Sequence, residues 1–259
     1  MRVAYSLLFW GFMVISSLIA FPLALIIWLL TVLVDPRLRA LHLFTCFWAS
    51  LYTWLNPAWR VTLSGKEKLD SNLPTIIVAN HLSLLDIIVV FRLFTHFKWV
   101  SKSENFHVPL IGWNMRLNGY IPIRRGDKSG VVQMMKRCRQ SLAEGNSICI
   151  FPEGTRSPDG RMRRFKVGAF DLAVQTQTPI QPLVIQGTSQ ALPKRGFKLQ
   201  GRHPISVEVL EVIPAESFAD KTAEDLAEEV RTLIGDRLGP GNAPRPRAKN
   251  ISSRKAEPA

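Results

Sequence analysis

The hydropathy pattern begins with an apolar run over residues 3–34 that contains no charged side chain. This run is longer than the roughly 20 residues that a membrane helix needs. It is also too long for a removable signal peptide, and it lacks the small-residue cleavage pattern of one. Because Pro22 lies inside the run and Gly11 near its start, we expect a kinked or broken helix here rather than a single straight one.

A second apolar stretch, over residues 40–59, follows a turn at Asp35-Pro36-Arg37. Its aromatic side chains gather toward its far end, as in an interfacial belt: Trp48, Tyr52, Trp54 and Trp59. Two arrangements fit this pattern: a two-helix hairpin that dips into the bilayer, or one full span followed by a helix that lies in the interface. In both, residues 1–59 form a membrane-anchoring helical segment; core helices of a soluble protein are the disfavoured alternative.

From residue 60 the pattern changes to that of a soluble α/β domain. Short apolar or alternating runs predict strands at residues 60–64, 75–79, 97–101, 119–125, 148–151, 179–185 and 205–212. Helical periodicity predicts helices at residues 129–144, 167–174 and 223–238, whereas residues 102–112 are predicted to be a loop. We expect the domain to cover residues 60–238. From 239 to 259, Pro, Arg, Lys and Ser dominate and predict a disordered basic tail.

The segment ICIFPEGTRS, residues 148–157, joins a buried strand to a loop suited to an anionic group. Pro152 ends the strand because it has no N–H to donate. Gly154 permits a sharp turn, so we expect the N–H groups of Gly154 and Thr155 to point outward beside the Arg156 guanidinium, where they would bind a phosphate or carboxylate. The alternative is an ordinary turn with a solvated arginine.

The segment NHLSLLD follows the predicted strand at 75–79 and contains His81 and Asp86. On one continuous helix their offset would place them about 140° apart. They can meet only if His81 lies in the turn before the helix and Asp86 in its first turn. Ser83 and Asp86 are spaced as an N-cap and its N3 partner, which predicts a helix start at Ser83 and leaves a purely capping role open for Asp86. A histidine oriented by a carboxylate is a plausible general base toward an alcohol.

Charge and composition indicate which classes of binding partner the protein has. The chain has 33 Lys and Arg against 20 Asp and Glu, a net charge of +13, so anionic partners are expected. The apolar N-terminal segment favours anionic lipid over nucleic acid. A basic cluster after the ICIFPEGTRS segment either attracts lipid headgroups or CoA phosphates, or forms a solvated loop face: Arg161, Arg163, Arg164 and Lys166. The other histidines and the three cysteines show no metal or redox spacing, so we expect no metal site and a reduced compartment.

Four segments together resemble the motifs of the glycerolipid acyltransferase family, typified by bacterial 1-acylglycerol-3-phosphate acyltransferase. NHLSLLD resembles its H-x4-D motif, GYIPIRR its second motif, FPEGTRS its third, and IQPLVIQGT, residues 180–188, its fourth, in which a proline lies in a strand. Their order and spacing agree over about residues 63–212. The resemblance implies an α/β fold with a mixed sheet flanked by helices, preceded by an N-terminal membrane helical segment.

The resemblance also implies an activity and roles for individual residues. An acyl chain moves from acyl-CoA or acyl-carrier protein to the sn-2 hydroxyl of 1-acylglycerol-3-phosphate, giving phosphatidate. His81 takes the role of general base and Asp86 that of the group orienting it. Acceptor-binding roles fall on six positions: Lys102, Arg125, Glu153, Gly154, Thr155 and Arg156. The family's second motif commonly ends in Asp-Arg, so Arg124 is a departure that bears on acceptor preference.

No cofactor is required, because a thioester is already an activated acyl donor. Ser83 and Cys149 are alternative acyl-enzyme nucleophiles, but the capping role of Ser83 and the strand position of Cys149 favour direct attack by the acceptor. We expect a protein of the cell inner membrane with its site on the cytoplasmic face, where the donors are. Two alternatives remain: acylation of another lysolipid, such as lyso-ornithine lipid or a remodelling substrate, and non-catalytic binding of anionic lipid.

Overall fold

The structure is a computed structural model that describes residues 2–194 and 197–240. Its helices are α1 Arg2–Thr31, α2 Arg39–Trp54, α3 Leu85–Phe91, α4 Ile111–Leu117, α5 Lys128–Ala143, α6 Gly168–Thr176, α7 Thr188–Ala191 and α8 Ala223–Arg237, with short 3-10 helices at η1 Lys66–Lys68, η2 Ser103–His107 and η3 Ala215–Phe218. Its strands are β1 Trp59–Ser64, β2 Ile76–Ala79, β3 Phe97–Lys102, β4 Ile121–Ile123, β5 Ser147–Ile150, β6 Ile180–Gln186 and β7 His203–Val209. Every predicted strand is present.

The strands form one mixed seven-stranded sheet in the order β1-β7-β6-β2-β5-β3-β4. Neighbours are parallel except β6 and β7, which are antiparallel. The predicted mixed sheet flanked by helices is therefore confirmed. Because β2 and β5 are adjacent and parallel, with Val78 opposite Ile150, the loops that follow them leave the same edge of the sheet.

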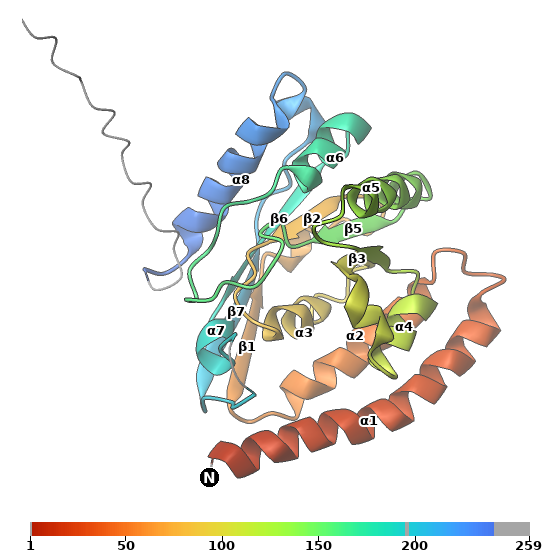
Figure 1. The fold of residues 1–259 in the computed structure, drawn as a ribbon, viewed down its shortest axis with the longest axis vertical. Helices are drawn as coiled ribbons and strands as arrows, with labels where there is room; N and C mark the ends of the chain where they lie inside the picture. The colour runs from red at the N-terminus through yellow and green to blue at the C-terminus, as the bar shows by residue number, and fades with distance from the viewer. Residues whose placement is uncertain (1, 195–196, 241–259) are drawn as a thin grey trace, which may run out of the picture.

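Helices cover both faces of the sheet (Figure 1). Ile76 and Val78 of β2 pack in the cluster formed with α5, α6 and α8, whereas Ile77 and Ala79 pack in the cluster formed with α1, α2 and α3. Successive side chains of a strand point to opposite faces, so a strand buried on both sides must be apolar throughout. This explains the continuous apolar run of β2, which directly precedes the NHLSLLD segment.

The N-terminal segment forms two helices that pack on the outside of the domain, α1 lying along α2 (Figure 1). Of the two expected forms of the first helix, kinked or broken, the break is absent: α1 runs through Pro22 as one helix, and its path is bowed rather than straight. A proline removes one hydrogen bond and bends a helix without necessarily ending it.

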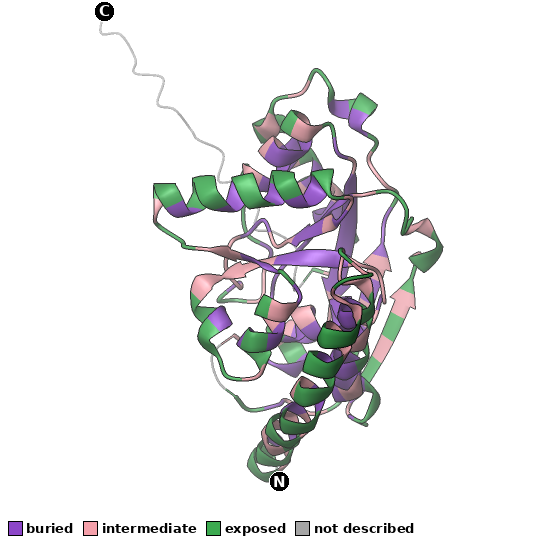
Figure 2. Cartoon of the chain, turned by 90° about the vertical axis from the view of Figure 1, so that its right-hand side faces the viewer, coloured by how far each residue is buried: buried purple, intermediate pink, exposed green. Residues whose placement is uncertain are grey.

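α1 has the length and composition of a membrane-spanning helix. Most of its surface is exposed in Figure 2, and large apolar side chains dominate that surface, among them Leu8, Ile15, Ile19 and Leu30. A contiguous apolar face of this size is stable only against lipid or another apolar surface. The chain is membrane-associated through this helix.

Contacts near the start and in the middle of α1 hold this helix against the domain. Near its start, the Trp10 indole donates to the Phe197 carbonyl at 2.8 Å, and the Ser6 hydroxyl accepts from the Leu199 amide at 3.0 Å. Farther along, Phe21 packs edge to face on Trp113 of α4, with ring centroids 5.5 Å apart. α1 is therefore a wall of the domain as well as an anchor.

Two other predictions differ from the structure. The predicted loop at 102–112 contains η2 and the start of α4. Gly112, interpreted as a loop residue, instead allows α4 to approach η2 closely, since a Cβ there would lie 2.6 Å from backbone atoms of Asn105 and Phe106. α7 was not predicted. The predicted tail lies outside the described residues from residue 241 onward.

Candidate active site

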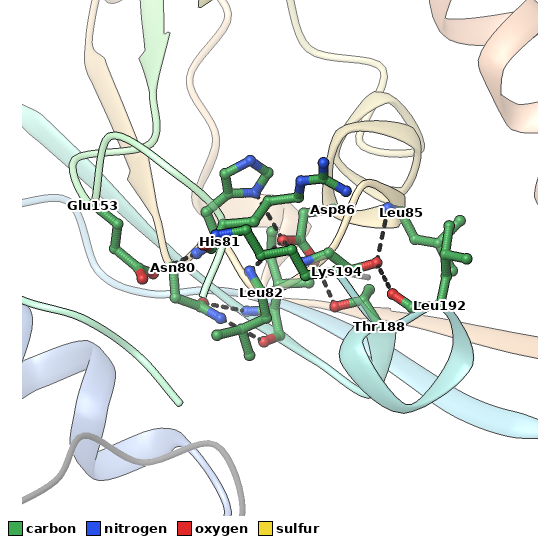
Figure 3. Close-up of polar contacts among 12 residues, drawn as sticks. Asn80, His81, Leu82, Leu85, Asp86, Glu153, Thr188, Leu192 and Lys194 are labelled. Atoms are coloured by element: carbon green, nitrogen blue, oxygen red, sulfur yellow. Dashed lines mark hydrogen bonds and ion pairs between the residues drawn. The ribbon is translucent and has the colours of Figure 1, made fainter. Parts of the chain in front are cut away.

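His81 and Asp86 meet at the end of β2 (Figure 3). His81 lies in the turn before α3 and Asp86 in its first turn, the geometry that their spacing requires. Asp86 is fully buried, and one of its oxygens, Oδ2, accepts from His81 Nδ1 at 2.9 Å, from Leu82 N at 2.6 Å and from Ser83 N at 2.8 Å. The other oxygen accepts from the Thr188 hydroxyl at 2.5 Å. These donors stabilise the carboxylate and fix its orientation.

The predicted helix start at Ser83 is two residues early, because α3 begins at Leu85. Half of the predicted capping box is nevertheless present, since Asp86 accepts from the Ser83 amide. The Ser83 hydroxyl accepts from the Leu85 amide at 3.2 Å and donates to the Leu192 carbonyl at 2.6 Å. Asp86 thus holds the backbone of the turn before α3 and the histidine ring at the same time.

The His81 ring is positioned from two sides. It stacks on Phe151 with centroids 4.0 Å apart and an interplanar angle of 8°. On its edge, Nδ1–H donates to Asp86, which leaves Nε2 as the basic nitrogen. The side chain is 11% exposed and lines a cavity of about 780 Å³. A hydroxyl group that enters this cavity can reach the imidazole.

The backbone of His81 is bound to the loop that follows β5. Its N–H donates to Glu153 Oε1 at 2.6 Å, and its carbonyl accepts from the Ser157 amide at 3.0 Å. The second oxygen of Glu153 accepts from the Arg163 amide at 2.9 Å. Glu153 is buried, and this burial raises its pKa to about 8, against the opposing effect of the two amide donors. Its carboxylate, expected at the acceptor, is instead occupied by the backbone (Figure 3).

Asn80 connects the site to β6. Its side chain exchanges two hydrogen bonds of 2.8 Å with the backbone of Ile185, in the way that one strand residue pairs with another. Asn80 and Thr188 were both missed as site residues. Each belongs to a segment that was singled out, but neither carries a charge or titrates near neutral pH, so residue type gave no signal of a role.

The turn at Gly154 forms as predicted, with φ +71°. However, the Gly154 N–H donates to the Phe151 carbonyl at 3.0 Å, so the prediction that it points outward is wrong. Gly154 lines the cavity with His81, whereas Thr155 and Arg156 are not among its described wall residues. The Arg156 carbonyl accepts from the Lys194 ammonium at 2.6 Å.

The two remaining predicted acceptor residues differ in position. Arg125 lines the cavity that contains His81, as a phosphate-binding side chain would. Lys102 is outside the described cavity wall and pairs with Glu104, at 2.9 Å between Nζ and Oε1, with both side chains substantially exposed. The structure therefore brings Arg125 and Gly154 together with His81 and leaves Lys102 in a surface ion pair.

Most of the cavity wall is apolar. α1 contributes Trp10 and Met13, α2 contributes Trp48 and Tyr52, and α3 contributes Ile88. A cavity of this volume accommodates a small-molecule ligand with an extended apolar part. The arrangement combines a general base, a cation and an apolar chamber, and it can activate a hydroxyl on an amphiphilic molecule.

Known proteins with similar sequences identify the family of this chain. Residues 60–186 match the model of the family described as Acyltransferase. The chain is 38% identical to the chloroplastic 1-acyl-sn-glycerol-3-phosphate acyltransferase LPAT1 of Arabidopsis thaliana over 231 residues, which cover 88% of this chain and 60% of that protein. It is 31% identical to the 1-acyl-sn-glycerol-3-phosphate acyltransferase of Limnanthes alba, over 76% of this chain and 69% of that protein. The chain belongs to the acyltransferase family.

A solved structure shares the fold of this family member. The crystal structure of the 1-acyl-sn-glycerophosphate acyltransferase PlsC from Thermotoga maritima superposes with a TM-score of 0.73 and 22% identity, covering 90% of this chain and 95% of that one. The chain spans about 60% of the length of the Arabidopsis relative and of relatives from Chlamydomonas reinhardtii and Brassica napus.

Proposed function

We propose that the protein transfers a fatty acyl chain from acyl-CoA or acyl-carrier protein to the sn-2 hydroxyl of 1-acylglycerol-3-phosphate, giving phosphatidate. The observation that carries the proposal is His81, held by Asp86 on the wall of an apolar cavity that also contains Arg125. Relatives that bear the name of this activity match most of the chain. Each feature matches one part of this substrate: His81 matches its hydroxyl group, Arg125 its phosphate, and the apolar cavity wall its acyl chain.

In the proposed mechanism, His81 Nε2 accepts the proton of the acceptor hydroxyl as its oxygen attacks the thioester carbonyl carbon. The C–S bond then breaks, and the leaving thiolate takes up the proton from the imidazolium. Asp86 stabilises that imidazolium and keeps the ring in its productive tautomer. The new ester bond requires no metal and no other co-reactant.

Direct attack by the acceptor is favoured over an acyl-enzyme. Cys149 is fully buried in β5, and this burial raises the pKa of its thiol. The Ser83 hydroxyl is buried and donates to the Leu192 carbonyl. Neither side chain is available as a nucleophile beside His81.

Within this proposal the predicted acceptor residues take different roles. Arg125 binds the acceptor phosphate, and Gly154 leaves room beside it. Glu153 acts indirectly, by holding the His81 amide. Lys102, Thr155 and Arg156 would act from outside the described cavity wall.

For the membrane segment we propose the hairpin rather than the full span. α1 is held against the domain near its start, by Trp10 and Ser6, and farther along by Phe21. A helix bound in this way cannot cross the bilayer without carrying the domain into the hydrocarbon. We propose that α1 and α2 lie in one leaflet, at the cytoplasmic face of the cell inner membrane, where acyl donors are present.

Acceptor-dependent thiol release tests the proposal. The purified protein in detergent should release CoA from acyl-CoA only when lysophosphatidate is added, and lipid analysis should identify phosphatidate. A panel with lyso-ornithine lipid and other lysophospholipids tests the alternative acceptors, and acyl-carrier protein tests the other donor. Thiol release without any acceptor would indicate a thioesterase; no release with any acceptor would leave only lipid binding.

A further inference from the structure

The cations that line the cavity differ from those that the sequence motifs highlight. Among the described wall residues, the lysine and arginine side chains are Arg125 and Lys166. Lys102 is paired with Glu104, and Arg156 is outside the wall. Within the basic cluster at residues 161–166, Lys166 is the residue that lies on the described cavity wall.

Lys166 is bound to the turn that follows β5. Its amide donates to the Pro152 carbonyl at 2.8 Å, which places the residue beside that turn. Its side chain then crosses the turn at Gly154: a Cβ at position 154 would lie 2.9 Å from Lys166 Cε and 3.0 Å from its Nζ. The glycine therefore serves two purposes, the positive φ and the open groove that the lysine occupies.

The charge of Lys166 is available to a ligand. The side chain is exposed, and none of the ion pairs between described residues involves it. Asp171, one turn into α6, is the carboxylate on the same wall, and both of its oxygens accept from the Gln175 amide at 2.9 Å. A lysine on the wall of a ligand cavity without a carboxylate partner is suited to bind an anion.

We propose that Lys166 binds a phosphate group together with Arg125 and so helps to select a phosphate-bearing acceptor. This inference rests on the proposed function. In 1-acylglycerol-3-phosphate only C2, C3 and one oxygen separate the reacting hydroxyl from the phosphate, so a hydroxyl at His81 places the phosphate on the adjoining wall. The phosphates of CoA are separated from the thioester by the whole pantetheine arm and would bind farther away. Two cations match the charge of a phosphate monoester.

Three variants isolate this role. Lys166→Met keeps the apolar stem and removes the charge, and Lys166→Arg keeps the charge. Arg164→Met removes an exposed cation two residues earlier that is not part of the described cavity wall. Each is measured in detergent for the KM of lysophosphatidate, the KM of acyl-CoA, and the rate with neutral 1-acylglycerol.

We expect Lys166→Met to raise the KM of lysophosphatidate about tenfold, the loss of one charge-assisted contact. The KM of acyl-CoA and any rate with 1-acylglycerol should stay unchanged. Lys166→Arg should restore most of the acceptor affinity, and Arg164→Met should match the wild type. An unchanged KM for lysophosphatidate in Lys166→Met would overturn the proposal. A rise confined to acyl-CoA would do so as well, by assigning the phosphate to the donor.

A binding measurement separates this inference from the proposed function. The probe is 2-deoxy lysophosphatidate, which has the acyl chain and the phosphate but no hydroxyl to acylate. Tighter binding to the wild type than to Lys166→Met supports the Lys166 assignment without any turnover, and equal binding overturns it. Failure of the wild type to acylate lysophosphatidate contradicts the proposed function instead.

Discussion

At the residue scale, the Asp86 carboxylate accepts hydrogen bonds from four different groups. It accepts from the His81 ring, from two amides of the turn before α3 and from the Thr188 hydroxyl. The same carboxylate holds that turn and fixes a histidine tautomer, so a structural and a catalytic interpretation of Asp86 are compatible. In Asp86→Asn the amide oxygen can take the place of Oδ2 and the NH₂ group can donate to the Thr188 hydroxyl, so this variant keeps most of the contacts and removes the negative charge.

The arginines give a first residue-scale prediction. Because Arg125 lines the cavity and Arg156 does not, Arg125→Ala should raise the KM of lysophosphatidate about tenfold and Arg156→Ala should raise it less. Both should change the KM of acyl-CoA little. Steady-state kinetics with each substrate varied in turn check this. Equal losses for donor and acceptor would place the arginines on the CoA side.

Glu153 gives a pH-dependent prediction. Burial raises its pKa from 4.5 to about 8, so between these values the folded protein holds a proton that the unfolded chain has lost. Its contribution to the free energy of unfolding is therefore fully present below pH 4.5 and is lost as pH rises through 8. Between about pH 6 and pH 9, the Tm of the wild type should fall by several degrees more than that of Glu153→Gln.

Thermal unfolding of both proteins across this pH range provides the measurement. Near pH 6 the two proteins should have similar Tm values, because the folded protein holds Glu153 protonated there and a glutamine offers the same one donor and one acceptor group. Parallel Tm curves for the two proteins would contradict the assignment of the titration to Glu153.

At the scale of the elements, apolar patterns predicted the strands well, because a strand buried on both faces must be apolar at every position. They did not predict α4 or α7, which are short and begin at positions where Gly112 and Gly187 resemble loop residues. The spacing of His81 and Asp86 gave the geometry under which they can meet, and the resemblance to the H-x4-D motif supplied the expectation that they pair. The direction of the Glu153 side chain could not, since nothing in the order of residues says whether a carboxylate after a strand faces the ligand or the backbone.

α1 provides the element-scale prediction. Trp10 and Met13 line the cavity, so deletion of residues 1–58 removes part of its wall and exposes apolar surface. The truncated protein should tend to aggregate. When it is kept in detergent, it should lose more activity with long-chain lysolipid acceptors than with short, water-soluble ones. Each CH₂ contributes about 0.8 kcal/mol to membrane partitioning, so a detached enzyme must extract long chains from the bilayer.

Kinetics of full-length and truncated protein across an acceptor chain-length series would measure this difference. The expected result is a ratio of kcat/KM values that widens as the chain lengthens. An equal loss at every chain length would mean that the segment is only a tether.

At the scale of the whole molecule, the site is assembled from segments far apart in the chain. The β2–α3 turn supplies His81, the loop after β5 holds its backbone, α7 supplies Thr188, and α1 and α2 close the apolar side of the cavity. The N-terminal helices and His81 therefore line the same cavity. Under the proposed function, this organisation lets a lipid acceptor reach His81 while its chain remains in an apolar environment.

Acyl transfer from acyl-CoA to lysophosphatidate by the wild type and His81→Ala, with phosphatidate measured directly, tests the central claim. The account predicts acceptor-dependent turnover in the wild type, a loss of at least roughly a hundredfold in His81→Ala, and unchanged membrane association of the variant. Near-normal phosphatidate synthesis by His81→Ala would contradict it.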